Sequence, residues 1–244
     1  MKQRVKIYGE RNTGTNYLTK LIENNFDVKI LKGTISKGSI FTFREWTKDL
    51  FFNLTKSKNL GWKHSVVDVN LVLNHKHKPV IITLTKNPYS FLLSLYKRPY
   101  HYKRNKPNTF INFLKEKWEL TERDNYNLES LDSPIDLWNI KNQSYIDLSN
   151  TYSNNLILTY EELLENPNKI IFSISDRLDI PLKDKFKNYD NSTKNDNKDF
   201  NDYQSYYLNE LWKKELDNDE VIFINSKLDL NVLSHFGYEI YRKK

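Results

Sequence analysis

Apolar and polar residues alternate or recur at helical spacing along the first quarter of the chain. Residues 5–8 alternate and contain β-branched side chains, which predicts a short strand. Residues 15–26 carry four large apolar side chains at helical spacing, and this pattern predicts an amphipathic helix. A second short strand is expected at 28–31, followed by a helix around 46–54.

The middle of the chain predicts a buried parallel sheet. Residues 80–85 are a continuous apolar run that ends at Lys86, as expected of a central parallel strand. Pro88 then favours a helix start, because proline is tolerated in the first helical turn. Residues 155–160 predict another strand, followed by a helix with acids in its first turn. Alternating strands and helices predict a three-layer α/β fold with a central parallel sheet flanked by helices.

The remaining segments are more polar. Residues 97–108 are basic and aromatic and predict an exposed loop, whereas 109–150 have the apolar spacing of helices. Residues 183–200 are rich in Lys, Asn and Asp, which is typical of a mobile surface segment. The tail at 203–241 predicts two or three short helices, and we expect the whole chain, 1–244, to form a single domain.

Composition narrows the classes of partner. Aromatic residues make up 14% of the 244 residues and supply large buried surfaces where aliphatic residues are scarce. The net charge of +7 favours anionic partners such as nucleotides, acidic glycans, nucleic acid or membrane surfaces, without choosing among them. The lack of cysteine excludes disulfides, thiolate metal sites and cysteine nucleophiles. Without a signal region or a long apolar run, we expect a cytoplasmic protein with no membrane span.

The junction of the first strand and helix has the layout of a phosphate-binding loop. Gly9 and Gly14 bracket four residues, so that backbone amides can turn inward beside a helix amino terminus. A nucleoside triphosphatase loop places a lysine directly after its second glycine, but Thr15 and Asn16 follow here. The loop therefore predicts a phosphorylated ligand other than a triphosphate, and its plainer interpretation is an ordinary strand-to-helix turn.

Further side chains have the chemistry of a phosphate or proton-transfer site. Lys86 ends the central strand and Ser94 lies eight residues later, so both could hold one phosphate at the ligand-binding edge of the sheet. His64 is a candidate general base, because histidine accepts a proton near neutral pH; its alternative is a structural role. No group of side chains has metal-ligand spacing, so no metal is expected, and the acid Glu10 is more typical of a pairing group than of a catalyst.

Three segments together resemble the cofactor-binding elements of sulfotransferases that use 3'-phosphoadenosine 5'-phosphosulfate (PAPS), a family with a P-loop-like α/β fold. Residues 11–17, RNTGTNY, resemble the loop that holds the 5'-phosphosulfate. Residues 86–96, KNPYSFLLSLY, are similar to the element that holds the 3'-phosphate. Residues 158–163, LTYEEL, are similar to a strand-to-helix junction whose tyrosine, here Tyr160, lies near the adenine.

The resemblance implies an enzyme that transfers a sulfuryl group from PAPS, as co-substrate and without a metal, to a hydroxyl or amine. The acceptor would be a small molecule or a glycan, and 97–150 would form a helical insertion on the acceptor side. The residues that the resemblance implies in donor binding are Arg11, Asn12, Thr13, Gly14, Thr15, Asn16, Lys86, Ser94 and Tyr160.

The sequence departs from the family pattern at two positions. Sulfotransferases usually have Lys or Arg at the position of Asn12, where it neutralises charge on the bridging oxygen. Arg11 or Lys63 would have to supply this charge, so the expected catalytic residues are Arg11, Lys63 and His64. Lys86 replaces an arginine, which keeps the charge but loses bidentate geometry.

Two other functions stay open at this point. One is a kinase-like P-loop transferase that uses ATP, which Thr15 disfavours because a lysine should stand there. The other is a non-catalytic basic module that binds nucleic acid or acidic glycan through residues 97–108, with strong salt dependence. For a sulfotransferase, no specific nucleic acid partner is expected.

Overall fold

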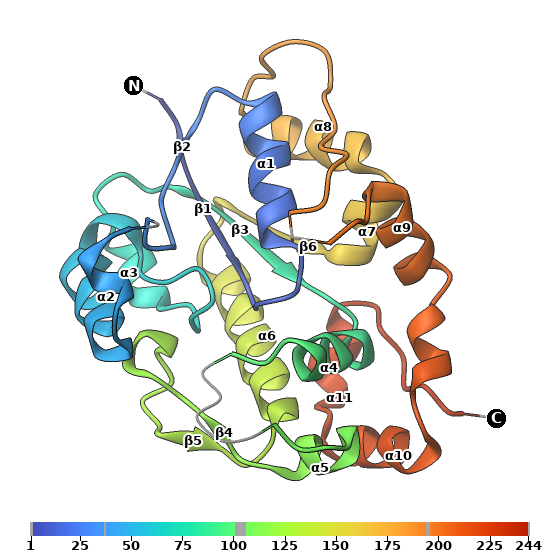
Figure 1. Ribbon diagram of the computed structural model, residues 1–244. Coiled ribbons are helices and arrows are strands. Elements are labelled where there is room, and N and C mark those ends of the chain that lie inside the picture. The colour runs from blue at the N-terminus through green and yellow to red at the C-terminus, as the bar shows by residue number, and fades with distance from the viewer. Residues whose placement is uncertain (1, 37, 101–105, 194–195, 244) are drawn as a thin grey trace.

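A parallel sheet forms the centre of the computed structural model, which describes residues 2–36, 38–100, 106–193 and 196–243 (Figure 1). The order of its strands is β2-β1-β3-β6, and all neighbouring pairs are parallel. The strands are β1 (Arg4–Gly9), β2 (Lys29–Ile30), β3 (Val80–Thr85) and β6 (Asn155–Thr159). The α/β fold with a central parallel sheet that the sequence predicts is therefore confirmed.

Helices make up most of the remaining structure. They are α1 (Thr15–Asn25), α2 (Glu45–Asn59), α3 (Val69–Leu73), α4 (Pro88–Lys97), α5 (Phe110–Lys115), α6 (Pro134–Thr151), α7 (Tyr160–Glu165), α8 (Pro167–Arg177), α9 (Phe200–Leu208), α10 (Asn218–Lys227) and α11 (Leu230–His235). Short 3-10 helices are η1 (Ile40–Thr42), η2 (Glu122–Asp124) and η3 (Leu211–Glu215). In the described part of the chain, none of these helices combines the length and apolar character needed to cross a bilayer.

Two apolar cores, one on each face of the sheet, hold the three layers together. On one face Ile7 of β1 packs in a cluster with Leu18 of α1. On the other face Ile81 of β3 belongs to a separate cluster with Val72 of α3 and Leu148 of α6. Figure 1 shows α1 in front of the sheet and α6 behind it. Because strand side chains alternate between faces, these two clusters account for the burial of β3 at every position.

The register of the sheet brings three strand ends to one edge. Gly9 of β1 lies opposite Leu84 of β3, and Thr85 of β3 lies opposite Thr159 of β6. The segments that follow β1, β3 and β6 therefore begin side by side, at the edge where parallel α/β sheets bind ligands.

The region 109–150 differs from the helical expectation. Between α5 and α6 the chain forms an antiparallel pair, β4 (Trp118–Glu119) and β5 (Ser130–Leu131). Trp118 has helical spacing from Leu114, but its ring packs edge-on against Phe113 from β4, with 6.2 Å between the ring centroids. The apolar spacing thus reflects burial of Trp118 in the core rather than a continuous helix.

The structure describes only part of each of the two polar segments, 97–108 and 183–200. Residues His101, Lys103 and Arg104 of the expected basic loop lie outside the described residues. In the segment 183–200, the backbone N–H of Lys187 donates to Asn25 of α1 at 2.8 Å, and the Tyr17 hydroxyl donates to Asn188 at 2.7 Å. This segment therefore runs along α1, and its mobility stays a prediction.

Candidate functional site

The loop after β1 turns through two left-handed residues. Asn12 has φ of 66° and Gly14 has φ of 90°, and the Thr13 hydroxyl donates to the Glu10 carbonyl at 2.6 Å. A side chain at position 14 would overlap the ring of Tyr160, which covers Gly14. Glycine is therefore required both by the backbone conformation and by the close approach of the ring.

The amino end of α1 is suited to an anion. Gly14 has no side chain to cap the helix, and the first intrahelical bond runs from Leu18 N–H to the Gly14 carbonyl at 3.0 Å. The amides of residues 15–17 therefore point out of the helix without intrahelical acceptors, and the helix dipole adds partial positive charge. Lys63 Nζ donates to Asn16 Oδ1 on this first turn at 2.6 Å, which adds a full charge.

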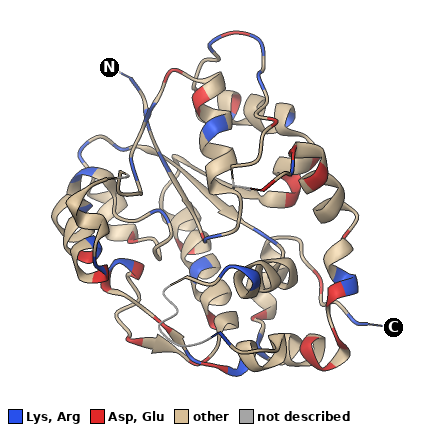
Figure 2. Ribbon diagram, in the orientation of Figure 1, with Lys and Arg blue, Asp and Glu red and all other residues tan. Residues whose placement is uncertain are grey.

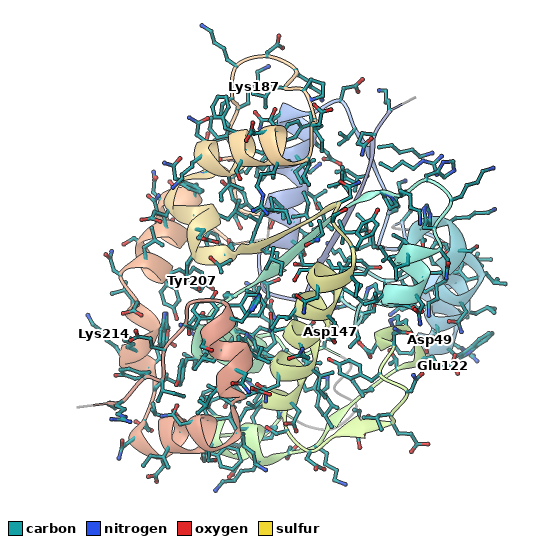
Figure 3. All side chains as sticks on the ribbon, turned by 180° about the vertical axis from the view of Figure 1, so that it is seen from behind. Asp49, Glu122, Asp147, Lys187, Tyr207 and Lys214 are labelled. Atoms are coloured by element: carbon teal, nitrogen blue, oxygen red, sulfur yellow. The ribbon has the colours of Figure 1, made fainter. Side chains whose placement is uncertain are left out.

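Lys86 forms a second cationic position at the same edge. Its side chain is fully buried, and Nζ lies 2.8 Å from Ser94 Oγ and 3.2 Å from the Asn12 carbonyl. A third partner, the hydroxyl of Tyr207 in α9 (Figure 3), lies 3.1 Å away. The structure thus brings Lys86 and Ser94 together, as their spacing suggests, and links them to the loop through Asn12.

Aromatic rings surround a small cavity between the loop and Lys86. Its lining includes Asn12, Gly14, Tyr17, Tyr160, Tyr189, Phe200, Tyr203 and Tyr207. The cavity measures about 40 Å³, which is room for a few water molecules. A larger cavity of about 670 Å³ is lined by Asn16, Lys63 and the segment after β2, and both cavities share Tyr189, Ser192 and Thr193. The segment 189–193 therefore lines both.

His64 is buried beside the end of β1 in a defined tautomer. Its Nδ1 lies 2.5 Å from the Gly9 carbonyl oxygen, which can only accept, so Nδ1 carries the proton and Nε2 keeps its lone pair. Burial, and then the charges of Lys63 and Arg11, hold the pKa of His64 well below its usual value. His64 is therefore neutral at physiological pH, with its lone pair on Nε2.

Two cations lie next to His64. Burial and the charge of Arg11 lower the pKa of Lys63 to about 8. The Arg11 guanidinium lies 4.5 Å from the ring centre of Tyr100 and 5.4 Å from that of Trp62. Its Nε is buried and makes no hydrogen bond with any residue that the structure describes. The three expected catalytic side chains thus lie together at the end of β1, and their roles stay predictions.

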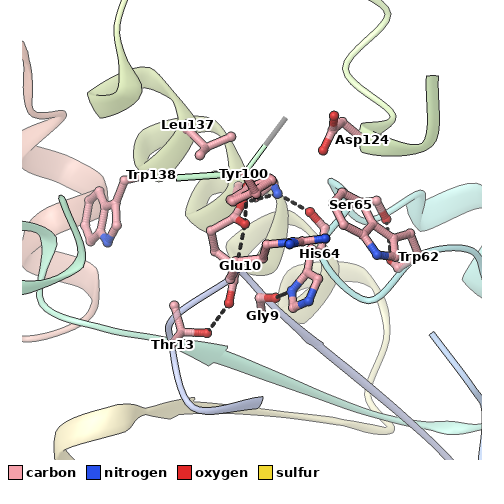
Figure 4. A network of polar contacts seen from close by, with 12 residues as sticks. Gly9, Glu10, Thr13, Trp62, His64, Ser65, Tyr100, Asp124, Leu137 and Trp138 are labelled. Atoms are coloured by element: carbon pink, nitrogen blue, oxygen red, sulfur yellow. Dashed lines mark hydrogen bonds and ion pairs between the residues drawn. The ribbon is translucent and has the colours of Figure 1, made fainter. Parts of the chain in front are cut away.

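A buried ion pair lies next to this group (Figure 4). The Glu10 carboxylate pairs with Lys141 of α6, and Lys141 Nζ also donates to the His64 carbonyl. Glu10 further accepts from the Tyr100 hydroxyl and, at 2.6 Å, from the backbone N–H of Arg11. Glu10 is therefore a pairing group, as expected, and the network ties the loop, the His64 segment and α6 together.

Sequence reasoning did not identify Lys141 and Tyr207. The signal for Lys141 was its position: it lies three residues after Trp138 and four before Tyr145, on the buried side of α6. A lysine at an apolar position of an amphipathic helix indicates a buried partner. Tyr207 had no such signal, because its contact with Lys86 joins residues 121 positions apart.

The site has no arrangement typical of a bound metal. Within the described ranges, no three His, Cys, Asp or Glu side chains are grouped as metal ligands.

No protein-family model and no curated protein matches the sequence. Among solved structures, the chain is similar to the sulfotransferase domain from the curacin biosynthetic pathway, with a TM-score of 0.52 and 9% identity over 99% of both chains. It is also similar to a sulfotransferase from Alicyclobacillus acidocaldarius, with a TM-score of 0.51 and 12% identity over 98% of this chain and 97% of that chain. At such identities the likeness shows a shared fold alone.

Proposed function

We propose that this chain transfers a sulfuryl group from PAPS to a hydroxyl or amine of a small-molecule or glycan acceptor. One observation carries the proposal: a single loop contacts two positions that suit an anion, the amino end of α1 beside Lys63 and the Lys86 side chain. Its end at Gly14 opens onto the amino end of α1, and its Asn12 carbonyl contacts Lys86. A donor with phosphate groups on both the 5' and 3' sides of one ribose suits two such positions, and the sulfotransferase fold agrees with it.

The residues present suit such a donor. The amides of residues 15–17 would hold the 5'-phosphosulfate, and Lys86 with Ser94 would hold the 3'-phosphate. Tyr160 and Tyr17 line the cavity between these positions and would contact the adenine. Because this cavity measures only about 40 Å³, a nucleoside can enter only if neighbouring groups move. We infer that a phosphate oxygen displaces the Tyr207 hydroxyl from Lys86 and that segment 189–193 opens.

In PAPS the sulfuryl group is bonded to a phosphate, which is a good leaving group. As the acceptor oxygen or nitrogen bonds to sulfur, the bond from sulfur to the bridging phosphate oxygen breaks. Nε2 of His64 takes the acceptor proton, because His64 is neutral and its Nδ1 is held by Gly9. Arg11 and Lys63 stabilise the charge that grows on the departing oxygen, in place of the cation missing at Asn12.

Binding competition between 3',5'-adenosine bisphosphate and ATP tests this function. We expect calorimetry to show tight, metal-independent binding of the bisphosphate, which a large excess of ATP fails to displace. Tighter binding of magnesium-ATP would contradict the proposal and favour an ATP-dependent transferase.

A further inference from the structure

The surface formed by η1 and the amino-terminal part of α2 exposes an unusual number of large apolar side chains. The exposed fractions are 72% for Ile40, 82% for Phe43, 59% for Trp46, 42% for Leu50 and 66% for Leu54. The last three follow one another at intervals of four residues, so they share one face of the helix. We call these five residues the η1–α2 apolar face.

This face is additional to the one that anchors α2 in the fold. Phe52 is buried, and its ring lies 6.4 Å from that of Trp62 in the main core. A helix on a protein surface is ordinarily apolar only on the side that faces the core. Because α2 is apolar on a second, outward side, the η1–α2 apolar face has the character of a contact surface.

The stretch of sequence that contains this face has a net positive charge. Residues 29–59 contain seven Lys or Arg and two acids, a net charge of +5 out of +7 for the whole chain. Both acids are neutralised within the fold, since Arg123 pairs with Glu45 and, at 2.6 Å, with Asp49. Figure 2 shows basic and acidic residues together on α2, and Asp49 is labelled in Figure 3. Arg44 and Lys58, in contrast, are exposed at the two ends of α2.

We propose that the η1–α2 apolar face docks this protein on an anionic membrane surface. Trp, Phe, Leu and Ile side chains insert at the level of the headgroups, and neighbouring cations are attracted by anionic lipids. A second copy of the chain fits less well, because it would bring two cationic surfaces together. An acidic lipid surface satisfies the apolar and the cationic features at once.

Docking would also place the larger cavity near the bilayer. Lys32, Gly33, Thr34 and Ser36 line that cavity together with Lys63, and the same segment leads directly into η1 at Ile40. The inference goes beyond the proposed function and does not depend on it, since it rests only on η1, α2 and their charges.

Vesicle co-sedimentation of the full chain tests the proposal. We compare vesicles of phosphatidylcholine with vesicles that also contain phosphatidylserine, at low and at physiological salt. The test variant is Trp46→Ser/Leu50→Gln/Leu54→Gln. The matched control is Phe172→Ser/Ile222→Gln/Leu230→Gln, whose native side chains are 51%, 57% and 58% exposed elsewhere on the surface.

We expect the wild type to bind the phosphatidylserine vesicles and to be released by salt. The test variant should bind at least about tenfold more weakly, because it loses the inserted apolar area. The control should stay within about twofold, and Arg44→Gln/Lys58→Gln should lose about fivefold per cation. All replaced side chains are exposed, so thermal melting should show native folding throughout.

Three results would overturn the proposal. The wild type could fail to sediment with phosphatidylserine vesicles at low salt, or the test and control variants could bind equally. Light scattering could instead show a wild-type dimer that the test variant dissociates, which would assign the face to a second copy. Calorimetry with 3',5'-adenosine bisphosphate on the same proteins reports separately on the proposed function.

Discussion

Removing Lys141 should destabilise this protein more than any surface substitution, because Lys141 is one half of a buried ion pair. Lys141→Met leaves the Glu10 carboxylate buried without its cation and the His64 carbonyl without a donor. Glu10 would keep two partners, the Arg11 backbone N–H and the Tyr100 hydroxyl. The perturbation therefore isolates the charge of Lys141 from the rest of the network.

The expected fall in the free energy of unfolding of Lys141→Met follows from these partners. Breaking a buried pair from one side costs about 3–5 kcal/mol, and the two remaining donors to Glu10 favour the lower end, about 3 kcal/mol. Loss of the hydrogen bond to the His64 carbonyl adds about 1 kcal/mol. We therefore expect the free energy of unfolding to fall by about 4 kcal/mol. Glu10→Gln should cost less, about 2 kcal/mol, because Lys141 keeps the His64 carbonyl as a hydrogen-bond partner.

Urea unfolding, followed by tryptophan fluorescence, measures these changes, and the double variant gives the sharpest result. Glu10→Gln/Lys141→Met should cost about 1–2 kcal/mol, less than Lys141→Met alone, since neutralising Glu10 removes the uncompensated charge and leaves mainly the lost hydrogen bond to the His64 carbonyl. Lys20→Met is the control: Lys20 pairs with Glu23 on the surface, so the loss should stay below about 0.5 kcal/mol. A double variant that costs the sum of the single changes would refute the reasoning.

Three further predictions concern the loop and its neighbours. Lys63→Met should stabilise the protein at pH 7, because burial of the charged lysine destabilises the folded state. Urea titrations should show this gain shrinking between pH 8 and 10.5, since in that range the folded wild type binds fewer protons than the unfolded chain. The wild type should lose stability as the pH falls below about 6.5, because unfolded His64 then takes up a proton that the folded protein excludes; His64→Asn should flatten this part of the profile. Gly14→Ala should lower the melting temperature well beyond Gly237→Ala, since both positions have positive φ but only Gly14 lies against the Tyr160 ring. Equal shifts for the two glycine variants, or pH profiles unchanged by the two other variants, would contradict these predictions.

The sequence predicted the sheet and its ligand edge because local patterns encode them. Residues 80–85 are all buried and four of the six are aliphatic, so the strand stands out from amphipathic segments. Gly9 and Gly14 mark the loop because two backbone positions there leave no room for a side chain.

Features that depend on long-range contacts could not be predicted in this way. The ladder of β4 and β5 has only two residues in each strand, too few for a recognisable alternation. The Glu10–Lys141 pair joins residues 131 positions apart, and neither residue indicates its partner. The apolar character of α2 was visible in the sequence, but only the packing of Phe52 shows which of its two apolar faces is buried.

Binding of 3',5'-adenosine bisphosphate and of AMP to the wild type and to Lys86→Met tests the central claim most directly. AMP lacks the 3'-phosphate that Lys86 and Ser94 would hold. Calorimetry should show the wild type binding the bisphosphate at least about tenfold more tightly than AMP, with Lys86→Met abolishing this preference and leaving AMP affinity nearly unchanged. Equal affinity of the wild type for both nucleotides, or a preference that survives in Lys86→Met, would contradict the account.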